Sequence, residues 1–187
     1  MGPDQEQWAR DLEQLRPVLV LLARQNVNPR LWKDVDPSGV VQETLLEAAR
    51  SQNQFEGREN SSPEGWVRRI LLNNLYDALR KVHRDKRDVD REVSLAGAIL
   101  ESSGRLERQL FGGDPSPSER AMAKEETLAL ANALAELEPS QRDVVELYHL
   151  QGRSLSETST LVGKSESAVA ALLHRGLKRL RELLQQR

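Results

Sequence analysis

The 187-residue sequence contains no cysteine. This absence excludes a disulfide scaffold, zinc sites built on thiolates, and cysteine nucleophiles. The three histidines, His83, His149 and His174, lie far apart in the sequence without metal-ligand spacing, so we expect no metal site and no cofactor. Aromatic residues make up only 4% of the chain, whereas leucine, alanine, glutamate, glutamine and arginine are frequent. This composition favours an all-α protein.

Long apolar runs are also missing. No run approaches the roughly 18 residues that a membrane span needs, and the first residues do not read as a signal peptide. We therefore expect a cytoplasmic protein without membrane insertion. The carboxylates form no recognisable catalytic pair, and the kinase-like triplet at 83–85 lacks the asparagine and the glycine-rich loop of a kinase. An enzyme is not predicted.

The net charge is small, −2, which for the chain as a whole argues against a nucleic-acid binder. The charge is unevenly distributed, however. Residues 1–65 and 88–163 carry −4 and −7, whereas residues 66–87 carry +5 and residues 164–187 carry +4. Two basic patches at the ends of helical units favour a polyanion such as nucleic acid, although either patch alone could be a solvated helix face.

Hydrophobic periodicity predicts an N-terminal helical domain of residues 1–87. Its helices are expected over residues 8–23, 36–51 and 63–82. Pro17 should kink the first helix or begin a second segment. The next helix opens with Asp36 as a cap and Pro37 at the first helical position.

The second half of the chain shows a linker and then a second helical domain. Residues 88–120 are rich in glycine, serine and proline, which predicts a linker with one short helix around 105–111. Within the domain 121–187 and just before it, helices are expected over 118–137, 139–150, 154–162 and 165–184. A short turn at Gly163 joins the last two helices. This spacing is typical of a helix-turn-helix, although a plain helical hairpin would look similar.

Five segments carry a family resemblance. Residues 36–46 read DPSGVVQETLL, residues 66–80 read WVRRILLNNLYDALR, and residues 134–142 read LAELEPSQR. GRSLSE and GKS follow within 152–165, and residues 173–181 read LHRGLKRLR. In this order, the segments resemble bacterial RNA polymerase sigma factors of the small, two-domain extracytoplasmic-function (ECF) type. The resemblance implies a subunit that binds core RNA polymerase and promoter DNA and that initiates transcription.

The resemblance implies that the helix at 36–51 docks on core RNA polymerase. From the residues alone, Gln42 and Glu43 with their apolar neighbours fit a protein partner better than DNA, because carboxylates repel phosphates. An amphipathic helix with a merely wet polar face is the alternative. Gly39 stands where the family commonly has a second acid. The residues assigned to polymerase binding are Asp36, Val40, Gln42, Glu43 and Leu46.

The resemblance also implies that the loop at 55–65 and the basic helix after it recognise and melt the minus-ten promoter element. Polar loop residues have the groups to read a flipped base, and basic side chains would position the phosphate backbone. Trp66 could offer a stacking face, although we expect it rather in the core. The residues assigned to the minus-ten element are Asn60, Ser61, Ser62, Trp66, Arg69, Asn73, Arg80, Lys81 and Arg84.

The helix-turn-helix would bind the minus-thirty-five element. Ser165 is a natural N-cap, and the start of a helix favours a phosphate. Ala170 and Leu172 stand where the family often has a basic residue and an arginine, and Thr158 and Ser159 replace an Ile-Ala pair. We therefore expect weak direct base readout and more shape readout. The assigned residues are Arg153, Ser165, Ser167, Ala168, Ala171, Arg175 and Lys178.

The resemblance further suggests control by an anti-sigma factor that covers the polymerase-binding surfaces. Two other functions remain open from the sequence. One is a helix-turn-helix transcription regulator that does not dock on polymerase, and the other is a helical adaptor with no role at DNA.

Overall fold

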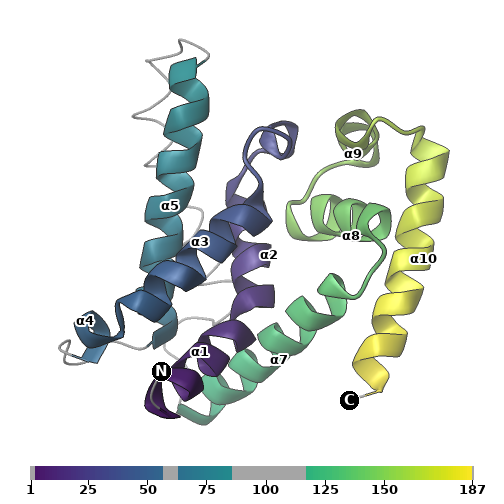
Figure 1. Ribbon diagram of the computed structural model, residues 1–187. Coiled ribbons are helices and arrows are strands. Elements are labelled where there is room, and N and C mark those ends of the chain that lie inside the picture. The colour runs from purple at the N-terminus through teal and green to yellow at the C-terminus, as the bar shows by residue number, and fades with distance from the viewer. Residues whose placement is uncertain (1–2, 57–62, 86–116, 187) are drawn as a thin grey trace. The chain divides into compact units, whose positions relative to one another are not determined.

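The computed structural model describes residues 3–56, 63–85 and 117–186, and the regular elements of these residues are all helices (Figure 1). The predicted all-α class is therefore confirmed. The chain divides into two compact units, residues 1–115 and 116–187, called unit 1 and unit 2 below. The short helix expected around 105–111 lies outside the described residues.

Unit 1 contains five α-helices and one short 3₁₀ turn within its described residues. The elements are α1 (Pro3–Gln14), α2 (Arg16–Asn26), η1 (Pro29–Leu31), α3 (Pro37–Arg50), α4 (Gln52–Glu56) and α5 (Pro63–Asp85). The helix expected over 8–23 is thus two helices, and Pro17 lies in the first turn of α2, where its missing N–H costs nothing. Asp36 caps α3, because its side chain accepts a hydrogen bond from the Ser38 backbone N–H at 3.0 Å.

The core of unit 1 lies where α3 packs against α5 and α2. Apolar positions three and four residues apart on each helix face this core, as the periodicity predicts. Burying one leucine side chain contributes about 1.5–3 kcal/mol. The residues with 0% exposure in this core include Val41, Ala48, Val67, Leu71 and Leu75.

A polar bridge joins α3 to α5 at the edge of this core. Thr44 is 0% exposed, and its hydroxyl donates to the Val40 carbonyl oxygen at 2.8 Å. The Asn74 side-chain amide on α5 donates to the Thr44 hydroxyl oxygen and to a Glu47 carboxylate oxygen, each at 3.2 Å. A buried hydroxyl is costly unless it is hydrogen-bonded, so this bridge favours one register of α5 against α3.

Unit 2 is a second helical domain. Its elements are α7 (Pro117–Ala135), α8 (Pro139–Val145), the π-helical turn η2 (Glu146–Leu150), α9 (Leu155–Val162) and α10 (Glu166–Gln185). The helix expected over 139–150 is α8 continued by the π-helical turn. The predicted 88–120 linker overlaps α7 at its end: α7 already begins at Pro117, which suits the first helical position because it has no N–H to satisfy.

The longest helix of unit 2, α10, packs against α8, α9 and α7. The contact with α8 is close at Gly176, which is buried. A Cβ atom at this position would lie 2.9 Å from the Val145 Cγ2 atom and 3.3 Å from the Gln141 Cβ atom. A glycine here lets the two helices approach more closely than any larger residue would.

Among the residues that the structure describes, no helix combines the length and the apolar character that crossing a membrane needs.

Candidate functional site

The exposed face of α3 carries most of the residues assigned to polymerase binding. Gln42 and Glu43 are exposed, and Leu46 is 46% exposed, which is high for a large apolar side chain. Leu46 follows Gln42 by one helical turn, so the two side chains lie on the same face. An exposed leucine bordered by polar groups is suited to a protein contact.

The Gln42 side chain is held by Arg16, which is not among the assigned residues. The Arg16 Nη2 atom on α2 donates to the Gln42 Oε1 atom at 2.8 Å and to the Glu13 Oε2 atom at 3.0 Å, and Arg16 Nε donates to Glu13 Oε1. The spacing of Glu13 and Arg16 indicates a helical ion pair. No local pattern connects Arg16 to Gln42, because 26 residues separate them.

Two other assigned residues of α3 have structural roles. Val40 is only 7% exposed and packs in the core on the face that it shares with Thr44, so little of its side chain is available to a partner. The Asp36 side chain is exposed but is engaged as the cap of α3. A Cβ atom at Gly39 would lie 3.0 Å from the Asp36 Oδ2 atom, so any side chain there would press on this cap.

Trp66 is buried, as expected for a core residue. It is 6% exposed and lies in an aromatic cluster with Trp8 and Phe55. Core packing therefore covers most of the ring that was expected to offer a stacking face. The assigned loop residues at 60–62 lie outside the described residues, and so does the side chain of Arg84.

The other assigned residues of α5 form an exposed polar face. Arg69, Asn73, Arg80 and Lys81 are all exposed. Arg69, Asn73 and Arg80 are spaced by four and seven residues, which places them on one side of the helix. At 1.5 Å per residue this stripe is about 16 Å long. Cationic groups spread over this length are suited to successive phosphates of a nucleic acid.

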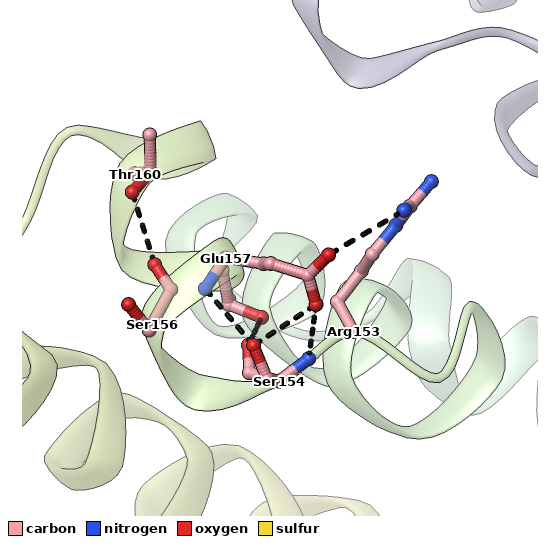
Figure 2. A network of polar contacts seen from close by, with 6 residues as sticks. Arg153, Ser154, Ser156, Glu157 and Thr160 are labelled. Atoms are coloured by element: carbon pink, nitrogen blue, oxygen red, sulfur yellow. Dashed lines mark hydrogen bonds and ion pairs between the residues drawn. The ribbon is translucent and has the colours of Figure 1, made fainter.

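In unit 2, a capping box begins α9 (Figure 2). The Ser154 Oγ atom accepts from the Glu157 backbone N–H at 3.2 Å, and the Glu157 Oε2 atom accepts from the Ser154 backbone N–H and hydroxyl, each at 2.9 Å. The Arg153 Nη1 atom lies 3.9 Å from the Glu157 Oε1 atom. These hydrogen bonds from Ser154, aided by the Arg153 charge, lower the pKa of the Glu157 carboxyl.

The turn after α9 shows why the chain forms a helix-turn-helix. Gly163 ends α9 with φ 65° and ψ 35°, in the left-handed region that glycine adopts without strain. Ser165 then caps α10, because its hydroxyl oxygen accepts from the Ala168 backbone N–H at 3.3 Å. Thr158, which replaces an apolar residue of the family pattern, is 0% exposed and donates to the Ser154 carbonyl oxygen at 2.9 Å. The hydroxyl is thus satisfied locally.

The outer face of α10 contains most of the residues assigned to the minus-thirty-five element. Of the assigned residues, Ala168 is half-buried; the others are exposed, namely Arg153, Ser165, Ser167, Ala171, Arg175 and Lys178. Leu172 is only 8% exposed and belongs to the core. His174 and Arg181 are not among the assigned residues, although both are exposed and helical spacing places them on the face of Ser167 and Lys178.

The described residues contain no group of three or more histidine, aspartate or glutamate side chains placed to hold a metal ion.

Comparison with known proteins identifies the family of the chain. Residues 13–85 match the family described as Sigma-70 region 2, and residues 127–180 match the family described as Sigma-70, region 4. The RNA polymerase sigma factor CarQ of Myxococcus xanthus is 32% identical over 163 residues, which are 87% of this chain and 80% of CarQ. The ECF RNA polymerase sigma factor SigX of Bacillus subtilis is 31% identical over 143 residues, or 76% of this chain and 68% of SigX. The chain is an RNA polymerase sigma factor of the ECF type.

The region 2 match of this sigma factor covers α2 to α5, and the region 4 match runs from residue 127 within α7 to residue 180 within α10, so it includes the helix-turn-helix. Promoter recognition in transcription initiation is therefore its function. A plain helical hairpin and an adaptor without a role at DNA are excluded by this membership. A solved structure, the sigma factor RpoE in complex with the anti-sigma factor NepR from Bartonella quintana, aligns over 94% of this chain and 95% of that one, with 22% identity and a TM-score of 0.36.

Proposed function

We propose that this sigma factor binds core RNA polymerase through the exposed face of α3. This proposal rests mainly on two side chains of α3. Leu46 is exposed, and Gln42 is held in place by a hydrogen bond from Arg16. An oriented amide beside an exposed apolar side chain offers both the polar and the apolar component of a protein interface. Glu43 on the same helix is exposed as well and disfavours DNA as the partner.

The same unit would bind the minus-ten element through α5. Arg69, Arg80 and Lys81 would contact phosphates, which fixes the position of the helix on DNA without specifying sequence. Asn73 lies on the same face and can donate and accept hydrogen bonds at a base edge. Because the Asn74 bridge joins α5 to α3, polymerase docking and promoter binding would act on one rigid framework.

In unit 2, α10 would enter the major groove at the minus-thirty-five element. The exposed side chains of its first two turns are mostly short, Ser167, Ala170 and Ala171 among them, so we expect few long donors at base edges. Arg175 and Lys178 would contact phosphates. Residues 1–87 and 121–187 would thus serve the two promoter elements, and residues 88–120 would pass through the polymerase toward its active site and RNA exit path.

The remaining assignments follow from this role. The chemistry of RNA synthesis belongs to the polymerase, so the sigma factor itself would be neither an enzyme nor a cofactor-binding protein. It would act in the cytoplasm, where core polymerase and promoters are. An anti-sigma factor that covers the α3 face would keep the protein inactive, and the solved relative RpoE in complex with NepR supports such a partner.

Run-off transcription with core polymerase tests the proposal. The double variant Gln42→Ala/Glu43→Ala should lose core binding and transcription together. Gln5→Ala/Glu6→Ala is a matched control, because it removes the same two residue types from an exposed position on α1. If both double variants bound core polymerase as well as the unchanged protein, the assignment of the α3 face would be wrong.

The DNA-binding assignment needs a separate comparison. Arg69→Ala should lower promoter binding by the holoenzyme while leaving core binding unchanged. Arg30→Ala, an exposed arginine in η1, is the control for loss of one positive charge. Equal losses of promoter binding for the two variants would show that only the overall charge matters.

A further inference from the structure

Three aromatic rings join helices of unit 1 that are distant in the sequence. The Trp8 ring on α1 stacks on the Phe55 ring of α4, with ring centroids 5.3 Å apart and planes at 20°. The Trp66 ring on α5 has its centroid 5.5 Å from that of Phe55 and 6.2 Å from that of Trp8. The Trp8 indole N–H also donates to the Ala48 carbonyl oxygen on α3 at 3.3 Å. Trp8 therefore contacts three other helices.

These contacts lie between the ends of two helices, α3 with the proposed polymerase-binding face and α5 with the proposed DNA-binding face. Ala48 lies in the last turn of α3, the proposed polymerase-binding helix, and Trp66 lies in the first turn of α5, the proposed DNA-binding helix. Phe55 and Trp66 stand on either side of residues 57–62 in the sequence. Arg69 follows Trp66 by three residues on the same helix. The packing of the Trp66 ring therefore affects the direction in which α5 presents Arg69, Asn73 and Arg80.

The hydrogen bond and the stacking act together. The hydrogen bond ties the Trp8 indole to the backbone of α3, and the stacked Phe55 ring passes this restraint to α4 and α5. An aromatic pair contributes beyond its buried area only while its geometry is kept. The match to Sigma-70 region 2 begins at residue 13, so Trp8 lies ahead of the matched segment.

We infer that Trp8 is a positioning residue for promoter melting. It holds α4 and the first turn of α5 against the end of α3, and it acts through Phe55 and Trp66 without touching DNA itself. Phosphate contacts tolerate small displacements, whereas capturing an unpaired base requires a fixed geometry. Loss of Trp8 should therefore impair strand opening more than it impairs binding. This inference rests on the proposed role of unit 1 at the minus-ten element.

The test uses the full-length protein bound to core polymerase. The DNA is a promoter recovered by selection with the unchanged holoenzyme, with 2-aminopurine in its minus-ten element to report opening. One template is fully paired, and the other carries a mismatched bubble that is already open. The variants are Trp8→Leu, which keeps an apolar side chain but removes the ring, and Trp8→Phe, which keeps a ring but removes the N–H donor. Val27→Ala is the control, because Val27 is 1% exposed in the same core at the end of α2.

We expect Trp8→Leu to slow opening of the paired promoter about fivefold, which corresponds to about 1 kcal/mol at 1.4 kcal/mol per factor of ten. On the mismatched promoter, transcription should return to within about twofold of the unchanged protein, since opening is no longer required. Affinity for core polymerase should not change. Trp8→Phe should open the paired promoter about twofold more slowly. If Trp8→Leu fails to fold, the opening rate of Trp8→Phe on the two templates tests the role of Trp8 instead.

Three results would overturn the inference. The first is equal loss by Trp8→Leu on the paired and the mismatched template. The second is a Val27→Ala variant that shows the same template-dependent loss, because any destabilisation of the core would then suffice. The third is normal opening by Trp8→Leu. If the unchanged holoenzyme selected no promoter at all, the proposed function itself would fail, which is a distinct outcome.

Discussion

The contact between α10 and α8 at Gly176 allows a sharp stability prediction. In an open helix, Gly176→Ala should stabilise by about 1 kcal/mol, because alanine is the better helix former. Here the added Cβ atom would lie 2.9 Å from the Val145 Cγ2 atom, whereas carbon atoms prefer about 3.5–4.0 Å. Val145 is 2% exposed and β-branched, so its methyl group has little freedom to rotate away.

Overpacking of a core by one methyl group costs about 1–3 kcal/mol. The gain in helix propensity offsets part of this cost. The free energy of unfolding of unit 2 should therefore fall by about 1 kcal/mol, which lowers Tm by about 4–8 °C for a domain of this size. Urea unfolding of the whole chain separates the two units. All three tryptophans, Trp8, Trp32 and Trp66, lie in unit 1, so their fluorescence follows unit 1 while far-UV circular dichroism follows both.

Ala170→Gly supplies the internal calibration. Ala170 is exposed on the same helix, so this variant should lose about 1 kcal/mol through helix propensity alone. We expect Gly176→Ala to shift the circular-dichroism transition toward lower urea, with the fluorescence transition unchanged. If Gly176→Ala instead stabilised unit 2 by as much as Ala170→Gly destabilises it, the close approach of α8 and α10 would be refuted.

Three further predictions concern the bridge, the cap and the DNA-facing helix. Thr44→Val should lower the free energy of unfolding of unit 1 by about 1 kcal/mol, because the new methyl group cannot accept the hydrogen bond from Asn74. Tryptophan fluorescence during urea unfolding measures this change, and an unchanged midpoint would contradict the bridge. The lowered pKa of Glu157 stabilises unit 2 above the ordinary glutamate pKa, and this contribution is lost as the pH falls through the lowered value. Glu157→Gln should therefore flatten the pH dependence of unit 2 stability below the ordinary glutamate pKa, and equal slopes for the two proteins would disprove this. Lys178→Ala should weaken holoenzyme binding alike on different promoters and make the salt dependence shallower by about one unit of slope; a loss confined to one base position would argue against phosphate contact.

The local features of the fold were predictable from sequence because they depend on neighbouring residues. Asp36, Ser165 and Gly163 were each expected at the helix boundary where they occur, since caps and left-handed turns need particular residue types. The helices of unit 2 begin and end within a few residues of their expected positions, because their apolar spacing is regular. The π-helical turn at 146–150 was not predicted, since hydrophobic spacing does not distinguish it from an α-helical turn.

The tertiary structure decided which side of each helix is buried. It also decided which side chains of other helices contact that helix. Val40 belongs to the sequence motif that was assigned to polymerase docking, but its side chain is buried. The reason is that α3 packs against both α2 and α5. Arg16 reaches Gln42, and Trp8 reaches Phe55, across 26 and 47 positions of sequence. The sequence by itself determined the helices, their caps and the family, since these depend on residue type and spacing along the chain. Only the packing of helices decided which assigned residues face solvent, because burial depends on neighbours that spacing along one helix does not identify.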